Sequence, residues 1–194
     1  ASDVYKRQPI DTVRVGFIGL GMRGPGAVKR FTHLEGVKIV ALCDIHPERV
    51  EDCQKVLRKA GLPEATDYSG SADAWKKLCE RDDIDLVYIS TDWDTHVPMS
   101  LFAMEHGKHV ACEVPIALTV EDCWKLVDMA EKTRLHCMML ENCCYDFFEM
   151  ATLNMAQKGI LGEIVHAEGA YIHDLRQLNF EDPARGGYNN WWRL

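Results

Sequence analysis

The sequence predicts an α/β fold, namely a doubly wound parallel sheet followed by the start of a second, α+β domain. Short apolar runs alternate with amphipathic stretches of helical period from residue 13 to about residue 142. The runs are almost continuously apolar, as expected for parallel strands covered on both faces. A glycine-rich turn follows the first run, and the alternation stops after Asn142. We therefore expect one domain over residues 9–142 and the beginning of another over 143–194.

The bulk composition is typical of a globular protein, with 194 residues of which 47% are hydrophobic and 27% are charged. The formal net charge of −8 and the scattered basic residues disfavour a nucleic-acid partner. No apolar run is long enough to span a membrane. We set residues 1–8 apart, because Asp3 to Gln8 reads like the in-frame translation of a sequencing adapter, so that the natural start and any signal peptide would be missing.

The first expected strand, Val13–Ile18, leads into the spacing G-x-G-x-x-G at Gly19, Gly21 and Gly24. Pro25 then opens a helix, as proline often does. A strand, this turn and a helix in that order are typical of a Rossmann-type dinucleotide-binding unit. The first glycine permits the tight turn, the second lets the backbone approach a pyrophosphate, and the third lets the helix pack closely on the strand.

The second expected strand, Val37–Cys43, ends at Asp44, about 20 residues after Gly24. A carboxylate at this place accepts hydrogen bonds from the adenosine ribose and repels a 2′-phosphate, so NAD is favoured over NADP. The alternative is an ordinary glycine-rich turn with a solvated aspartate. That alternative leaves the whole order of strand, turn, helix, strand and acid to coincidence.

The rest of the first domain continues the alternation of strands and helices. We expect helices over residues 47–60, from about 71, from about 97 to 107 and over 119–132, and strands over 84–90, 108–113 and 135–140. Tyr68 falls in a short link and residues 91–96 form a turn. Thr119 with Asp122 resembles a capping box at the start of its helix.

The second domain opens with a helix from about Asp146 to Lys158, followed by an extended strand from Glu163 to His173. One strand cannot close a core by itself, so we expect the chain to be a truncated fragment. The eight cysteines form no C-x-x-C pair and no cysteine–histidine set with zinc spacing. We expect them to be reduced and mostly buried, and we expect no metal site.

Ligands of open parallel sheets bind beyond the carboxyl ends of the strands, and several turns deliver side chains to that edge. The candidates there are Met22, Arg23, Asp44, Trp93, Asp94, Thr95, His96, Glu113, Val114 and Asn142. Taken singly, some have ordinary interpretations: Arg23 as a solvated helix-start residue, His96 as a neighbour of a helix N-cap and Asn142 as a turn residue. Their common edge favours the functional interpretation.

The glycine turn, the acid after the second strand and Glu113-Val114-Pro115 together resemble the Gfo/Idh/MocA family of NAD(P)-dependent proteins. That family usually has Glu-Lys-Pro, whose lysine assists proton transfer near the nicotinamide. Val114 takes the place of that lysine here and can neither donate a proton nor polarise a hydroxyl. This departure from the family pattern argues against an ordinary sugar or alcohol dehydrogenase.

One branch of the family, the NAD-dependent α-N-acetylgalactosaminidases of glycoside hydrolase family 109, is similar over nearly everything from Val13 onward. The shared motifs are Gly-Met-Arg-Gly at 21–24, Trp-x-x-His at 93–96, Glu-Val-Pro at 113–115, Glu-Asn-Cys-Cys-Tyr at 141–145, the segment 166–176 and Trp-Arg-Leu at 192–194. The resemblance implies that Tyr171 and Arg193 contact a glycan substrate and that the candidates listed above contact NAD. Without it, Tyr171 is a packing residue and Arg193 stacks on the neighbouring tryptophans.

The resemblance also implies a reaction in which the sugar is transiently oxidised at C3, the C1 substituent is eliminated, water adds and NAD is recycled. Glu113 is the candidate acid, base or orienting residue, whereas His173 and Asp174 have an equally good structural interpretation. The family's Tyr-Pro-Thr-His motif would lie beyond Leu194, so we expect the fragment alone to be inactive. A sugar or cyclitol dehydrogenase and a non-catalytic NAD-binding regulatory module stay open as alternatives, as does assembly into a homo-oligomer.

Overall fold

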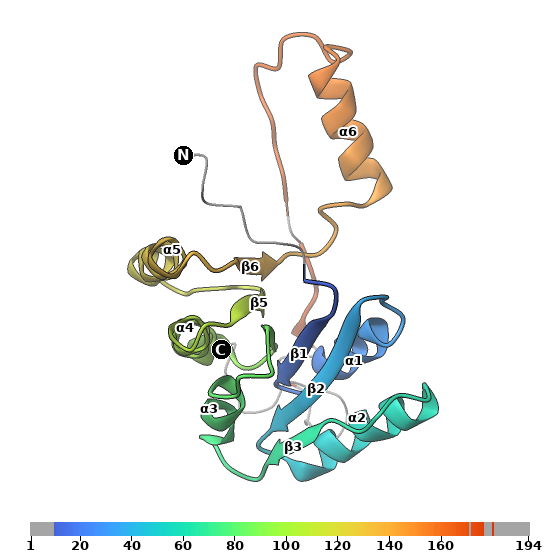
Figure 1. The fold of residues 1–194 in the computed structure, drawn as a ribbon. Helices are drawn as coiled ribbons and strands as arrows, with labels where there is room; N and C mark the ends of the chain where they lie inside the picture. Colours follow the sequence, from blue (N-terminus) through green and yellow to red (C-terminus); the bar gives the residue numbers. More distant parts are fainter. Residues whose placement is uncertain (1–9, 171, 177–179, 181–194) are drawn as a thin grey trace. The chain divides into compact units, whose positions relative to one another are not determined.

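The computed structural model describes residues 10–170, 172–176 and 180, and the chain divides into two compact units, residues 1–141 and 142–194. The first unit contains one sheet of six strands in the order β3-β2-β1-β4-β5-β6 (Figure 1). The strands are β1 Val13–Ile18, β2 Val37–Asp44, β3 Thr66–Ser69, β4 Leu86–Ile89, β5 His109–Glu113 and β6 Cys137–Leu140. Every pairing is parallel, which confirms the doubly wound α/β sheet.

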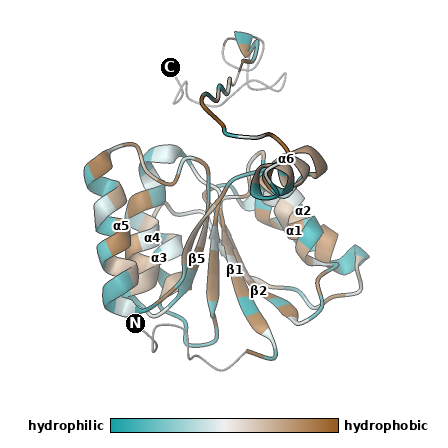
Figure 2. Cartoon of the chain, turned by 90° about the horizontal axis from the view of Figure 1, so that it is seen from above, coloured by the Kyte–Doolittle hydropathy of each residue, from teal (hydrophilic) through white to brown (hydrophobic). Residues whose placement is uncertain are grey.

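Five helices cover the two faces of this sheet (Figure 2). On one face lie α1 Gly24–Phe31 and α2 Pro47–Lys59. On the other lie α3 Ala74–Cys79, α4 Trp93–Glu105 and α5 Val120–Thr133. Thr119 caps α5 as expected, because its Oγ1 accepts a hydrogen bond from the Asp122 backbone N–H at 3.1 Å and donates to Asp122 Oδ2 at 2.8 Å.

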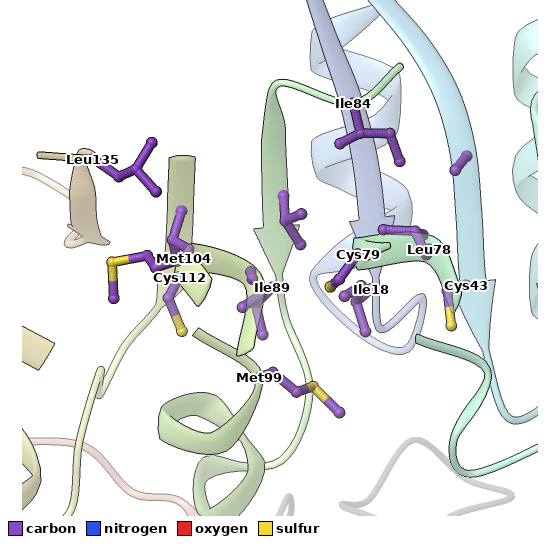
Figure 3. Packing of buried hydrophobic residues seen from close by; sticks show 14 of the residues in the cluster. Ile18, Cys43, Leu78, Cys79, Ile84, Ile89, Met99, Met104, Cys112 and Leu135 are labelled. Atoms are coloured by element: carbon purple, nitrogen blue, oxygen red, sulfur yellow. The ribbon is translucent and has the colours of Figure 1, made fainter. Parts of the chain in front are cut away.

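Two cores lie on opposite faces of the sheet because successive strand residues alternate between them. Phe17 and Tyr88 pack on the side of α1 and α2, whereas Ile18 and Ile89 pack on the side of α3, α4 and α5. Figure 3 shows the second core, with Ile89 beside Met104 and Cys112. A sheet buried on both faces has strands without polar alternation, as the sequence indicated.

All eight cysteines are free thiols, as expected. Burial raises the pKa of Cys43, Cys79 and Cys112 to about 12, so these thiols stay protonated and pack as small apolar groups. Three of the eight are exposed, namely Cys123, Cys143 and Cys144, so the burial is less general than the sequence suggested.

Three details differ from the sequence-based expectations. Residues 66–69 form edge strand β3 and not a link, because a short polar segment can pair along an edge without an apolar pattern. Helix α4 begins at Trp93 and not near Val97, since Pro98 lies inside the helix rather than at its first turn. The strand expected from Glu163 to His173 is absent from residues 163–170 and 172–173, where the described chain offers it no neighbouring strand to pair with.

The second unit contains α6, Phe147–Gln157, close to the expected bounds. None of the residues of α6 is buried. In the described part of the chain, no helix is long and apolar enough to cross a membrane.

Candidate functional site

The glycine turn after β1 is fixed by backbone contacts that only glycine permits at its first position. Gly19 has a φ of 89°, and a Cβ there would lie 2.5 Å from the Ser90 carbonyl oxygen. The Gly19 N–H donates to the Cys43 carbonyl at 2.9 Å, and Ser90 Oγ donates to the Gly19 carbonyl at 2.7 Å. The turn is therefore held between β2 and the end of β4.

The other two glycines differ in what surrounds them. A Cβ on Gly24 would lie 2.2 Å from the Gly19 carbonyl oxygen, so the start of α1 approaches the turn as closely as expected. A Cβ on Gly21 would have one described neighbour within 4 Å, Arg49 Nη1 at 3.7 Å. The fold itself does not require glycine at position 21, and the open space beside it fits a group that approaches the backbone, as a pyrophosphate does.

Asp44 is 6% exposed, and its carboxylate bonds to the backbone of the same turn. Its Oδ2 accepts the Leu20 N–H at 2.7 Å and its Oδ1 accepts the His46 N–H at 2.9 Å. Arg49 Nη1 lies 3.5 Å from Oδ1. A carboxylate has about four lone-pair positions, so Asp44 can bind the turn and still accept a hydrogen bond from a ribose hydroxyl.

Met22 and Arg23 form the tip of the turn. Met22 is 64% exposed, and Arg23 is an exposed residue at the N-cap of α1 without a capping bond from its side chain. Both are accessible to a ligand over the start of α1, where helix N–H groups are free to bind an anion.

The segment from Trp93 to His96 forms the first turn of α4, after β4. Thr95 Oγ1 lies 2.7 Å from Thr91 Oγ1 and 2.7 Å from the Asp92 carbonyl oxygen. Asp94 is exposed. Burial, and then the nearby Asp94 charge, raise the pKa of Asp92.

His96 is 1% exposed and joins two loops of the site. Its Nδ1 lies 2.7 Å from the Pro115 carbonyl oxygen and its Nε2 lies 3.1 Å from the Thr91 carbonyl oxygen. A neutral imidazole has one N–H and donates to one of these carbonyls at a time. His96 thus connects the loop after β4 with the loop after β5, and its contact with a cofactor stays a prediction.

Glu113 ends β5, and its partner is a tyrosine that the sequence analysis did not single out. Tyr88, on β4, donates from its hydroxyl to Glu113 Oε1 at 2.7 Å. Burial, and next the hydrogen bond to Glu113, raise the pKa of Tyr88 above its ordinary value. In the sequence, strand alternation indicates only that each of the two side chains faces one side of the sheet. The β4–β5 register, which pairs Tyr88 with Ala111, puts Tyr88 and Glu113 on the same face.

The first unit therefore brings most of the expected residues to the carboxyl edge of one sheet. Those it places there are Gly19, Gly21, Met22, Arg23, Gly24, Asp44, Trp93, Asp94, Thr95, His96, Glu113 and Val114. Asn142 is the first residue of the second unit, so its expected cofactor contact stays a prediction. Tyr171 and Arg193 lie outside the described residues, and Asp174 is paired with Arg176 at 2.6 Å.

Family profiles agree with this arrangement. A profile described as "Oxidoreductase family, NAD-binding Rossmann fold" (GFO_IDH_MocA) matches residues 13–141. The chain belongs to the Gfo/Idh/MocA family. A second profile, "Glycosyl hydrolase 109, C-terminal domain", matches residues 145–191. The expected fold, the NAD cofactor and the resemblance to the glycoside hydrolase family 109 branch are confirmed.

Curated relatives of this Gfo/Idh/MocA chain are longer than the chain. "Glycosyl hydrolase family 109 protein 1" of Bacteroides fragilis (strain YCH46) is 66% identical over 182 residues, which are 94% of this chain and 38% of the relative. "Alpha-N-acetylgalactosaminidase" of Bacteroides fragilis (strain ATCC 25285) is 61% identical over 184 residues, which are 95% of this chain and 43% of the relative. The chain thus spans about two fifths of the length of these two proteins.

Solved structures of the same fold are more distant in sequence. The aldose-aldose oxidoreductase of Caulobacter crescentus, complexed with glycerol, has a TM-score of 0.65 and 25% identity over 78% of this chain and 44% of that one. Apo scyllo-inositol dehydrogenase of Lactobacillus casei has a TM-score of 0.68 and 19% identity over 80% of this chain and 44% of that one. The second likeness supports the fold alone.

Proposed function

We propose that the whole protein is an NAD-dependent glycosidase that removes terminal α-linked N-acetylgalactosamine. The observation that carries this proposal is the 61% identity to a protein named alpha-N-acetylgalactosaminidase, over 95% of this chain. The residues of the site are consistent with such an enzyme, because they offer a dinucleotide cradle without the usual lysine after Glu113.

The residues of the first unit would bind the cofactor in three places. The turn at Gly21 and the start of α1 would hold the pyrophosphate, and Asp44 would accept a hydrogen bond from the adenosine ribose. Glu113 and Val114, at the end of β5, would lie toward the nicotinamide. When bound, NAD supplies reversible oxidation of the sugar at C3, which acidifies the proton on C2.

The side chains at the end of β5 limit the proton chemistry of this unit. Val114 has no titratable group, so it cannot take the role that lysine has elsewhere in the family. Glu113 has a carboxylate with one oxygen held by Tyr88, so we assign it the acid, base or orienting role. In this reaction no pair of glycosidase carboxylates is needed, because the C1 substituent leaves by elimination.

The test is an assay of the whole protein on a chromogenic α-N-acetylgalactosaminide, together with absorbance at the wavelength of the reduced cofactor. We expect release of the chromophore without net accumulation of NADH. Accumulation of NADH with a free sugar or cyclitol, and no glycoside cleavage, would instead identify a dehydrogenase. Cofactor binding with neither activity on a panel of glycosides would identify a regulatory module.

A further inference from the structure

Tyr88 is a buried titratable residue whose ring is held in an aromatic cluster. It is 4% exposed and lies on β4, on the face covered by α1. Its ring stacks on Phe17 with centroids 5.0 Å apart, and Phe31 of α1 meets it edge-on at 5.7 Å. A buried tyrosine held in this way has a fixed hydroxyl position, and such hydroxyls usually have a hydrogen-bond partner.

The hydroxyl of Tyr88 interacts with an anionic and with a cationic side chain. It donates to Glu113 Oε1 at 2.7 Å, and the Arg30 guanidinium of α1 also interacts with it, an effect that opposes the rise of the Tyr88 pKa. A phenol with its ordinary pKa of 10 already keeps its proton at neutral pH, and burial raises the pKa of Tyr88 further, so the hydroxyl remains a donor. A hydrogen bond from a neutral donor to a carboxylate is among the stronger kinds in proteins.

The contact with Tyr88 involves only one of the two carboxylate oxygens of Glu113. The register of β4 and β5 places Tyr88 opposite Ala111, so Glu113 is two residues further toward the carboxyl edge on the same face. Within the described part of the chain, no hydrogen bond or ion pair is found for Glu113 Oε2. One carboxylate oxygen is therefore fixed by the core and the other is available at the edge where the glycine turn lies.

We propose that Tyr88 is a positioning residue that fixes Glu113 by one oxygen and so presents the other oxygen to the cofactor or the sugar. The idea rests on the proposed function, in which Glu113 is the acid, base or orienting group. A glutamate at the end of a strand can adopt several rotamers. Every rotamer that points the carboxylate elsewhere reduces the fraction of molecules in which the free oxygen of Glu113 is in place. The Tyr88 hydrogen bond selects one rotamer.

The experiment is a double-mutant cycle in the whole protein, made of Tyr88→Phe, Glu113→Gln and the double variant. Tyr88→Phe keeps the ring in its aromatic cluster and removes only the hydroxyl. If Tyr88 acts through Glu113, the phenylalanine lowers kcat/KM by about tenfold in the wild-type background and has little further effect beside Glu113→Gln. A role in stability alone predicts losses that multiply, or none, and either result overturns the proposal.

A second readout does not depend on turnover. We expect the same non-additivity in the Kd for NAD⁺, measured by calorimetry, because Glu113 lies toward the nicotinamide in the proposed function. Tyr68→Phe, on β3, is the matched control: it removes a hydroxyl from a partly buried tyrosine on another strand and should leave both readouts unchanged. If Tyr68→Phe lowered activity and NAD⁺ affinity equally, the losses in Tyr88→Phe would come from disturbed packing and not from the contact with Glu113.

The two proposals fail separately. A wild-type protein without glycosidase activity refutes the proposed function, while the cycle in NAD⁺ affinity still decides whether Tyr88 acts through Glu113. Glycosidase activity with no coupling between the two positions refutes the role of Tyr88 and leaves the proposed function standing.

Discussion

The amino and carboxyl ends of the parallel strands, here called the amino edge and the carboxyl edge, differ in how completely their polar groups are paired. At the amino edge, Arg14 and Asp85 form a bidentate pair, with the guanidinium 2.7 and 2.8 Å from the two carboxylate oxygens. The backbone N–H of Arg14 adds a third bond to the same carboxylate at 2.8 Å, and Lys108 Nζ donates to the Arg81 carbonyl beside it. The polar groups named here are paired with one another within the protein.

At the carboxyl edge, the polar groups are paired only in part. Asp44 has acceptor capacity beyond its two backbone bonds and the contact with Arg49, and Glu113 has one oxygen beyond the Tyr88 contact. Gly21 adds an open position in the backbone. The amino edge thus stabilises the unit, whereas the carboxyl edge keeps hydrogen-bonding capacity that a ligand can use, as parallel α/β sheets generally do.

Two glycines of the carboxyl edge should respond differently to alanine, one with a loss of stability and the other with a loss of NAD⁺ affinity. Gly19→Ala should lower the free energy of unfolding of the whole protein by about 2 kcal/mol or more, because the new Cβ meets the Ser90 carbonyl and φ is positive. Gly21→Ala should leave stability nearly unchanged and weaken NAD⁺ binding by about tenfold or more. Urea unfolding and calorimetry measure the two effects.

A control for this prediction is Gly61→Ala, where φ is 71° and a Cβ would meet nothing within 4 Å. It has the backbone strain of Gly19→Ala without the collision, so it should cost less. Equal costs at positions 19 and 61 would show that the close approach to Ser90 is not what requires glycine. Unchanged NAD⁺ affinity in Gly21→Ala would remove the pyrophosphate from this turn.

A smaller effect is expected at the amino edge. The Asp85 pKa lies below its ordinary value of 3.8, mainly because the Arg14 guanidinium hydrogen-bonds to the carboxylate. The contribution of Asp85 to stability is therefore complete above that ordinary value and is lost as the pH falls through the lower, folded-state value. Asp85→Asn should destabilise the protein at neutral pH, and the difference from wild type should shrink below about pH 4.

Thermal unfolding between pH 3 and pH 7 measures this difference, with the exposed Asp128→Asn as a charge-matched control. NAD⁺ affinity at neutral pH should be the same in Asp85→Asn and wild type, because the pair lies at the edge away from the glycine turn. A loss of affinity without a loss of stability would break the distinction between the two edges.

The sequence predicted those parts of the fold that depend on local pattern. Buried strands such as Val37–Asp44 show as apolar runs, and the backbone of the turn requires glycine at positions 19 and 24, so both could be recognised. Edge strand Thr66–Ser69 could not, since half of it faces solvent and its residues carry no apolar signal. Its existence depends on pairing with β2.

The candidate site shows the same limit. Spacing located Asp44 and Glu113 at strand ends, because parallel strands place their carboxyl ends together. The partners of these residues depend on tertiary register: Tyr88 reaches Glu113 from another strand, and His96 bonds to the Pro115 carbonyl across two loops. Sequence identifies which residues stand at an edge, but not which of their atoms are already occupied.

A last prediction tests whether the core stays closed to solvent directly beneath Asp44 and Glu113. Cys43 and Cys112 directly precede Asp44 and Glu113, and both thiols are buried, with a pKa of about 12. Because alkylation needs an accessible thiolate, a folded protein should be modified first at the exposed Cys123, Cys143 and Cys144 and only after unfolding at Cys43 and Cys112. Mass spectrometry of peptides after brief iodoacetamide treatment measures the order. Rapid modification of Cys112 in the native protein would mean that the core under α3, α4 and α5 opens to solvent beside the end of β5, and the carboxyl ends of the strands would then not be a rigid platform for a ligand.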